Sequence, residues 1–288
     1  MTYETEQGNF ALPTNVISDG IAAALVSAVV ALPWVKKENL PANTNVKLAR
    51  KAGKLESASL NESSNWTYGA DSEYTESSVS CTATKQAAAI KMTVEAEQFG
   101  TLSIGGAAPE LGAALARQLD DNILTLFSSF TSNTAVTEAA GMTGTGVLRA
   151  AMRVDAALAG TPGRPKILIC SHRQAFDLRA EMITSGAANF AQPSQISLLS
   201  GMNDGNGYAG MLPGVMVFVT DGLPTSGGDD VALVFNPDRA FFGMYSGAPI
   251  VRQNWIGSQG FFTEITAHIF SGVVEYHDQA GCRVLSDS

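Results

Sequence analysis

The feature that most constrains this chain is a stretch of forty residues, Leu60 to Phe99, which favours strands but contains few large apolar side chains. It reads LNESSNWTYGADSEYTESSVSCTATKQAAAIKMTVEAEQF, with one glycine and no proline. Small apolar and hydroxylated residues alternate around Cys81, and a second alternation surrounds Met92, as in half-buried strands. A two-stranded hairpin is marginally stable by itself in water. We therefore expect a neighbouring subunit to cover the hairpin.

The large apolar side chains of this hairpin are few and include aromatic residues toward its far end. An aromatic residue that is exposed on an extended arm is the kind of residue that anchors a protein contact. The sequence therefore predicts inter-subunit contacts at Leu60, Trp66, Tyr68 and Tyr74. The alternative is a solvent-exposed insertion with a disordered tip, because long polar loops are often mobile.

Composition and charge exclude several classes of protein. The 288 residues include 18 Lys and Arg against 27 Asp and Glu, a net charge of −9, so the chain has no basic surface for tight binding of nucleic acid. The apolar run Ile21–Leu32 is too short to span a bilayer and follows an acidic N-terminus, which is unlike a signal peptide. Its spacing predicts a buried or docking helix that stops at Pro33. Three widely spaced cysteines predict neither disulfides nor a zinc ribbon.

The remaining segments predict an α+β fold. A long helix is expected where Pro109 suits the first turn and an apolar stripe follows, formed by Leu111, Leu115, Leu119, Ile123, Leu126 and Phe130. The glycine-rich GMTGTG reads as a flexible connection to a second helix, Val147–Leu158. A buried strand KILIC precedes a helix opened by a capping box at Ser171 and Gln174. Further strands are predicted at GVMVFVT, VALVF, AFFGMY and Phe262–Tyr276.

Residues that could carry chemistry form no recognisable catalytic motif. Cys170 and His172 could pair as a nucleophile and base, but a buried strand cysteine beside the first residue of a helix is the more ordinary interpretation. The three histidines lack the spacing of metal ligands, and GMTGTG lacks the strand and the Lys-Ser/Thr of a phosphate-binding loop. Asp204 and Asn206 lack the further oxygen ligands of a cation loop. We therefore predict no catalytic, cofactor-binding or metal-binding residue.

The order and spacing of these segments resemble the major capsid proteins of tailed bacteriophages, whose Johnson fold is shared with encapsulins and the capsid floor domain of herpesviruses. The resemblance covers most of the chain. It rests on the hairpin that leads into KQAAAIKMTVEAEQF, the long helix with LARQLDDNILTLF, the step LICSHRQAFDLRAEM, the segment GMLPGVMVFVTDGLP and the closing strand before QAGCRVL. It implies an α+β phage major capsid fold that works through its interfaces.

The resemblance also implies a division of the chain into four parts. They are an N-terminal arm (1–44), an extended hairpin called the E-loop (45–85), a P-domain (86–133 and 254–288, with a spine helix at about 105–131 and a long strand at about 262–276) and an A-domain (134–253). The loops 201–210 and 221–230 would form the tips of the A-domain around the symmetry axes. This adds Asp204, Tyr208, Asp229 and Asp230 to the interface candidates.

The implied function is structural. Hexamers and pentamers of the chain would assemble into an icosahedral shell around the double-stranded DNA of a tailed phage, in the cytoplasm of the bacterial host. A separate scaffolding protein (or a chain already trimmed), a portal and a decoration protein are the implied partners. An acidic wall suits weak, non-specific contact with packaged DNA. An encapsulin shell is the nearest alternative, and a hydrolase using Cys170 and His172 is a more distant one.

Overall fold

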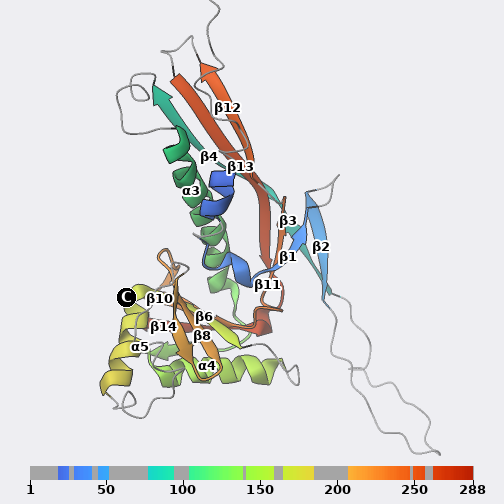
Figure 1. The fold of residues 1–288 in the computed structure, drawn as a ribbon. Helices are drawn as coiled ribbons and strands as arrows, with labels where there is room; N and C mark the ends of the chain where they lie inside the picture. The colour runs from blue at the N-terminus through green and yellow to red at the C-terminus, as the bar shows by residue number, and fades with distance from the viewer. Residues whose placement is uncertain are drawn as a thin grey trace, which may run out of the picture.

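The computed structural model contains two sheets that lie one above the other and a strand pair beside the upper one (Figure 1). The upper sheet has five strands, the lower sheet has seven, and the strand pair consists of β2 and β3. Helices and strands do not alternate regularly, which confirms the predicted α+β class. The structure describes residues 19–25, 29–40, 45–51, 77–93, 104–138, 141–158, 165–184, 207–246, 249–256 and 262–287.

The five-stranded sheet is built on one long strand, β13 (Phe262–Glu275), as the sequence predicts. β4 (Thr84–Thr93) pairs with one edge of β13, and both β11 (Phe241–Tyr245) and β12 (Ile250–Ile256) pair with the other edge. β1 (Lys36–Asn39) adds a parallel pairing to β11. Neither β1 nor β12 was predicted from the sequence.

The spine helix α3 (Ile104–Leu124) lies against one face of this sheet (Figure 1) and continues as the 3-10 helix η3 (Thr125–Ser129). The predicted apolar stripe faces the core, because all its members are buried except Leu126, which is half-buried. Pro109 lies in the second turn and not in the first, since the helix starts at Ile104. A helix of 21 residues along the sheet gives this half of the subunit a stiff axis.

The N-terminal segment packs beside the spine helix. Residues 19–25 are helical, and the 3-10 helix η1 (Leu32–Trp34) follows. Four apolar residues at helical spacing in the predicted docking helix are buried in the same core as α3, namely Ile21, Leu25, Val29 and Leu32. The prediction that Pro33 stops a helix is wrong, because Pro33 lies inside η1, where its missing N–H is tolerated.

The extended run at 77–93 is one length of chain that changes its pairing partner. β3 (Ser77–Thr82) pairs antiparallel with β2 (Val46–Lys51), whereas β4 begins at Thr84 and pairs with β13. The alternation around Cys81 matches burial, since Cys81 and Ala83 are buried while Ser80 and Thr82 are exposed. The change of partner occurs at Ala83, close to the expected re-entry of the hairpin into its own subunit.

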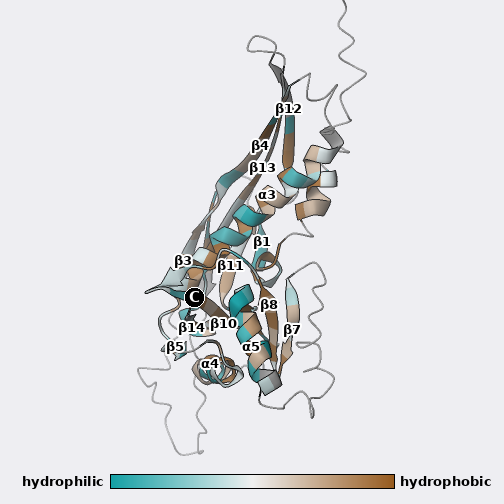
Figure 2. Ribbon diagram, turned by 90° about the vertical axis from the view of Figure 1, so that its left-hand side faces the viewer, coloured by the Kyte–Doolittle hydropathy of each residue, from teal (hydrophilic) through white to brown (hydrophobic). Residues whose placement is uncertain are grey.

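The seven-stranded sheet holds the second half of the molecule. Its order is β5-β14-β10-β6-β8-β7, with β9 also paired to β10. The strands are β5 (Val136–Glu138), β6 (Lys166–Cys170), β7 (Tyr208–Leu212), β8 (Val215–Val219), β9 (Thr225–Ser226), β10 (Asp229–Phe235) and β14 (Gly281–Asp287). Their apolar residues appear as brown stretches in Figure 2, notably on β8 and β10.

Two helices cover one face of this sheet, α4 (Gly144–Ala157) and α5 (His172–Thr184). The capping box of α5 is confirmed: the Ser171 N–H donates to Gln174 Oε1 at 2.9 Å, and the Gln174 N–H donates to Ser171 Oγ at 3.2 Å. The prediction of a flexible GMTGTG connection is wrong at its C-terminal half, because Gly144 already starts α4. Thr143 caps that helix by accepting the Gly146 N–H at 3.0 Å.

The two sheets divide the chain differently from the expected boundaries of the P-domain and A-domain. β11 and most of β12 lie within the expected A-domain (134–253), yet they belong to the five-stranded sheet. β14 lies within the expected P-domain segment (254–288), yet it is a strand of the seven-stranded sheet, between β5 and β10. The chain therefore crosses between the sheets at residues 236–240 and again at 276–280.

Four phenylalanines fill the junction between the sheets. The ring centroid of Phe241 lies 5.2 Å from those of Phe130 and Phe235 and 6.1 Å from that of Phe127. All four side chains are fully buried, and they belong to one core with residues of both sheets. Within the described residues, no helix combines the length and the apolar character needed to cross a membrane.

Candidate functional site

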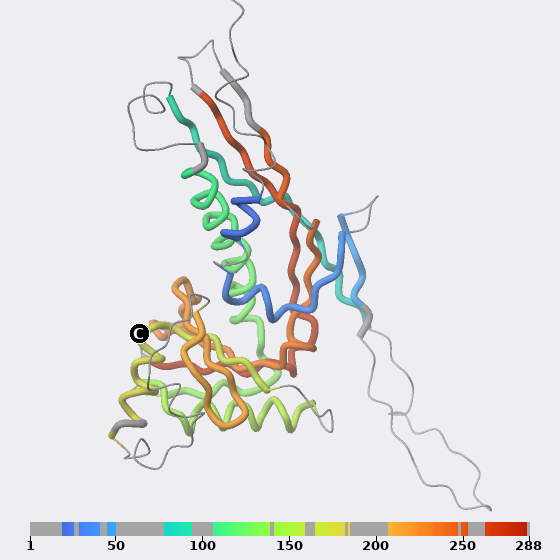
Figure 3. Tube along the Cα trace, in the orientation of Figure 1, coloured from blue at the N-terminus to red at the C-terminus, as the bar shows by residue number. Residues whose placement is uncertain are grey.

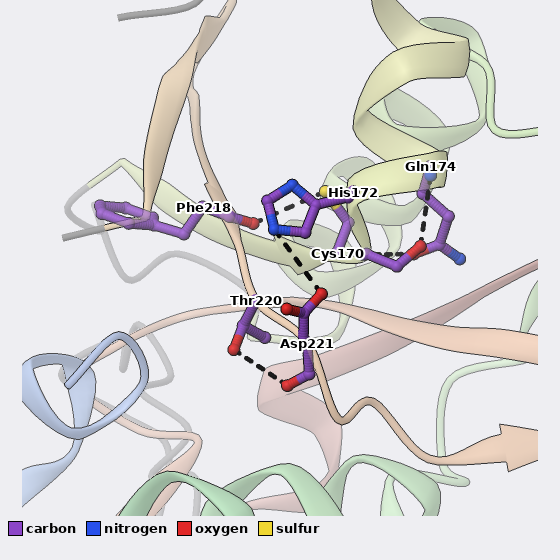
Figure 4. Close-up of polar contacts among 7 residues, drawn as sticks. Cys170, His172, Gln174, Phe218, Thr220 and Asp221 are labelled. Atoms are coloured by element: carbon purple, nitrogen blue, oxygen red, sulfur yellow. Dashed lines mark hydrogen bonds and ion pairs between the residues drawn. The ribbon is translucent and has the colours of Figure 1, made fainter. Parts of the chain in front are cut away.

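Cys170 and His172 do not form the nucleophile and base considered from the sequence. Cys170 ends β6, is fully buried, and its Sγ lies 3.5 Å from the carbonyl oxygen of Phe218. His172 is exposed, and its Nε2 lies 3.6 Å from Asp221 Oδ1 (Figure 4). Burial raises the pKa of the Cys170 thiol to about 12, so the thiol is protonated at neutral pH. This geometry opposes the hydrolase hypothesis.

We expect iodoacetamide to leave Cys170 unmodified in the folded protein. The reagent cannot reach the buried side chain, and the thiol is protonated and therefore unreactive. Mass spectrometry of tryptic peptides measures the modification. Cys81 and Cys282 are also buried and serve as internal comparisons. Denaturation should make all three react, whereas rapid native labelling of Cys170 alone would restore the hydrolase hypothesis.

The start of α4 is a poor anion site, because two carboxylates already lie beside it. Glu181 Oε2 accepts the Gly144 N–H, and Asp177 Oδ2 accepts the Met142 N–H at 3.4 Å. These negative charges would repel a phosphate from the helix N-terminus. Among the described residues, no three His, Cys, Asp or Glu side chains gather as metal ligands would.

Asp120 has a role that sequence reasoning missed. It is 5% exposed, and its carboxylate accepts the N–H groups of Val30, Ala31 and Leu32 at 2.6, 3.1 and 3.1 Å. Burial raises the pKa of this carboxyl, while the three N–H donors act in the opposite direction. The contact fixes the N-terminal segment to α3, where their traces lie side by side (Figure 3).

The base of the hairpin has two different faces. One face packs on the five-stranded sheet, where Ala49, Cys81 and Ala83 share a small core with Phe242 and Met244 of β11. The chain crosses β13 at Gly272, where an added Cβ atom would lie 2.3 Å from the Thr82 carbonyl oxygen. The other face exposes Val46 by 40% and Leu48 by 61%. The hairpin thus combines an anchor to its own subunit with an apolar outer face.

Most of the predicted interface residues lie outside the described residues, namely Leu60, Trp66, Tyr68, Tyr74 and Asp204. Tyr208 is the first residue of β7 and is half-buried. Its ring lies 5.4 Å from that of Phe218, which in turn lies 5.0 Å from the ring of Trp34. The Tyr208 ring therefore packs within its own subunit, and its contact with another subunit stays a prediction.

Asp229 and Asp230 begin β10 and are half-buried. They pair with Asp287 and Ser286 of β14, and the Asp230 carbonyl oxygen accepts Gln174 Nε2–H at 3.0 Å. The loop before them lies next to the spine helix, since a Cβ atom on Gly222 would lie 3.3 Å from Asp121 Oδ1. This end of the seven-stranded sheet therefore faces the upper half of the subunit. The opposite end, with the turn between β7 and β8, points away from it (Figure 1).

Two further exposed apolar residues lie on the helices of the lower half. Met152 on α4 is 70% exposed and Phe176 on α5 is 67% exposed. Phe176 is out of phase with Ala175 and Leu178, two buried apolar residues of its helix. A helical projection of the capped α5 segment would have found Phe176 from the sequence. Large exposed side chains of this kind are candidate protein contacts.

The chain combines two sheets joined by a common core with a hairpin anchored on one of them. A family model described as phage capsid protein matches residues 75–284, which is well over half of the chain. The chain belongs to the phage capsid protein family. It is a structural component of the virion, and the predicted major capsid identity and Johnson fold are confirmed. None of the curated proteins matches the sequence.

Solved structures share the fold at low sequence identity. A structure described as Mycobacterium phage Che8 is 14% identical with a TM-score of 0.64, covering 89% of this chain and 90% of that one. The head structure of Helicobacter pylori bacteriophage KHP40 is 10% identical with a TM-score of 0.67, covering 91% of both chains. A virus-like particle from Pyrococcus furiosus is 9% identical with a TM-score of 0.59, covering 94% of this chain and 98% of that one.

Proposed function

We propose that this capsid protein self-assembles as hexamers and pentamers into an icosahedral shell around the double-stranded DNA of a tailed phage. The observation that carries the proposal is the hairpin, which is anchored at Phe242 and Met244 but exposes Val46 and Leu48 on its other face. An outer face of this kind is stabilised when another subunit covers it. The shell would work through such repeated contacts and without a catalytic step.

We further propose that each sheet, together with the helices that cover it, forms one domain. The five-stranded sheet with α3 would be the P-domain, and the seven-stranded sheet with α4 and α5 would be the A-domain. The far end of the seven-stranded sheet, at the β7–β8 turn, is the better candidate for the axial tip than the loop 221–230, which lies beside α3. A separate scaffolding protein, a portal and a decoration protein remain proposed partners. Assembly in the host cytoplasm remains part of the same proposal.

Electron microscopy of the purified chain tests the assembly, first alone and then with the products of neighbouring genes. Hollow shells of uniform size are the expected result. A chain that stays monomeric under all salt and pH conditions would contradict the proposal. Terminase and portal genes beside this one would favour the phage shell over an encapsulin. The encapsulin stays the alternative because a virus-like particle from Pyrococcus furiosus shares the fold.

Trp66→Ala should weaken shell formation while leaving the folding of the subunit largely intact, because we propose that Trp66 contacts another copy. Shell yield by gradient sedimentation and subunit stability by chemical denaturation are the two measurements. Trp255→Ala is the comparison, since it removes the same side chain from β12. Equal loss of shells and of subunit stability in Trp66→Ala would mean that Trp66 packs on its own subunit.

A further inference from the structure

His268 is buried on a face of β13 where the neighbouring residues are half-buried. The side chains of a strand alternate between two faces, and on β13 one set points into the core that includes α3. His268 belongs to the other set, in which Thr266 and Phe270 are half-buried. Only 7% of His268 is exposed, and its ring meets the ring of Phe270 edge-on, with the centroids 6.0 Å apart. An ionisable ring is therefore held away from water in the middle of the sheet.

Two cations flank His268, one on each neighbouring strand. β4 and β12 lie on either side of β13 (Figure 1). Lys85 of β4 stands opposite Phe270, and Arg252 of β12 stands opposite Thr266, so each cation is a diagonal neighbour of His268. Diagonal neighbours on one face of an antiparallel pair are about 7–8 Å apart, which is within the reach of long side chains.

Within the described part of the sheet, no negative charge compensates these two cations beside His268. The charged residues on this face of β4, β12 and β13 are Lys85, Lys91, Arg252 and Glu264. Glu264 lies four residues from His268 and stands opposite Lys91. The hairpin base reaches the same face with Thr82 and Ala83, which carry no charge. A proton on His268 would therefore meet two positive charges at close range.

The surroundings of His268 favour its neutral form. Burial lowers the pKa of His268, and the charges of Lys85 and Arg252 lower it further. The unfolded chain lacks both effects, so its histidine binds a proton at about pH 6.5. As the pH falls below this value, the unfolded chain takes up a proton that the folded sheet resists, and the folded state loses stability. The loss is at most about tenfold in the unfolding equilibrium for each unit of pH.

Of the two strands beside His268, β12 is held less firmly. Among the described strands, β12 pairs with β13 alone, over seven residues. β4 pairs with β13 over ten residues, and its Met92 is buried in the core with α3. On β12, by contrast, Ile250 is 46% exposed and Arg252 is exposed. Separation of β12 from β13 would admit water to His268 and remove one of the two cations, while β4 stays paired.

We propose that His268 is an acid-operated switch at the edge of the five-stranded sheet, in which a proton that binds the ring drives β12 away from β13. The proton comes from solvent and adds to a ring nitrogen, and no covalent bond of the chain breaks. The inference goes beyond the proposed shell function and does not depend on it, because every group that it uses belongs to one subunit. In a shell the switch would act in every copy, since each copy carries the same site.

The first test measures the proton affinity of each histidine in the unmodified chain. The hydrogen on the carbon between the two ring nitrogens exchanges with deuterium at a rate that depends on ring protonation. Mass spectrometry of peptides separates His268 from His172 and His277. We expect the pKa of His268 to be lower in the folded chain than in the denatured chain, and Lys85→Ala with Arg252→Ala to raise it. Equal values in the folded and denatured chains, or no change in the double variant, would overturn the proposal.

The second test compares the acid sensitivity of His268→Gln with that of the unmodified chain. Between about pH 7.5 and about pH 5, the unfolding equilibrium constant of the unmodified chain should rise at least about threefold more than that of the variant, because glutamine gains no proton. Chemical denaturation measures this difference. His172→Gln is the matched control, since it removes an exposed histidine from α5. Equal acid sensitivity of His268→Gln and the unmodified chain would contradict the switch.

Amide hydrogen exchange locates the opening. In the unmodified chain, β12 should lose protection at about pH 5 while β4 keeps it, because β4 has the longer pairing and the contact with α3. His268→Gln should keep β12 protected at both values of pH. Loss of protection in β4 and β12 to the same extent would overturn the inference. The comparison of folded and denatured chains needs no variant, so it decides the question even where His268→Gln does not fold.

Discussion

Asp120→Ala should lower the free energy of unfolding of the subunit by about 3 kcal/mol or more, because it leaves three buried N–H groups without their acceptor. An unpaired buried donor costs about 1–3 kcal/mol, and the loss of packing adds to this cost. The helix at 19–25 and the turn at η1 depend on the same contact, so we expect the N-terminal segment to separate from α3. Chemical denaturation of unassembled subunits measures the first effect, and hydrogen exchange at Val30 to Leu32 measures the second.

Asp121→Ala is the matched control, because it removes the same carboxylate from the next position of α3, where the side chain is exposed. It should change the free energy of unfolding by about 0.5 kcal/mol or less. Asp120→Asn should fall between the two variants, since an amide keeps one acceptor oxygen but presents its NH₂ group to the remaining donors. If Asp120→Ala and Asp121→Ala have equal effects, the three hydrogen bonds do not hold the N-terminal segment.

The parts of the fold that were predicted correctly are those whose signal is local. The apolar stripe from Leu111 to Phe130 repeats at helical spacing, and α3 with η3 covers nearly all of it. Ser171 and Gln174 satisfy each other's backbone N–H groups within four residues, so their pattern alone defines the start of α5. β13 is long and alternates regularly, which identifies it without knowledge of its partners.

The parts that could not be predicted depend on residues far apart in the chain. β12, which was not predicted, pairs with one edge of β13. β14 joins a sheet whose other strands lie between residues 136 and 235. A strand that is defined mainly by its neighbours carries a weak signal of its own. The bonds of Asp120 span 88 to 90 residues, and no spacing rule connects a helix aspartate with three backbone N–H groups at that distance.

The candidate site shows the same division. The sequence indicated that the hairpin needs a second surface, because its composition is a local property. It did not indicate where the hairpin base is anchored, since Ala49, Cys81 and Phe242 come from three strands and meet only in the folded subunit.

Gly272→Ala should prevent shell formation while leaving most of the subunit folded. A methyl group at this position would lie 2.3 Å from the Thr82 carbonyl oxygen and 3.0 Å from Ala83 Cα, and both are backbone atoms. The hairpin base must therefore move away from β13. Overpacking of this kind costs about 1–3 kcal/mol. Because β3 is continuous with Thr82, a shift at Thr82 should disturb the contact that we propose between the hairpin and a neighbouring copy.

Ser271→Ala is the control for this substitution, since it changes the adjacent residue of β13 and removes a buried hydroxyl that has no hydrogen-bond partner. We expect normal shells from Ser271→Ala and unassembled, folded subunits from Gly272→Ala, measured by electron microscopy and by thermal unfolding. The spine helix α3 and the aromatic cluster around Phe241 should keep their protection from hydrogen exchange. Normal shells from Gly272→Ala would mean that the position of the hairpin base does not govern assembly.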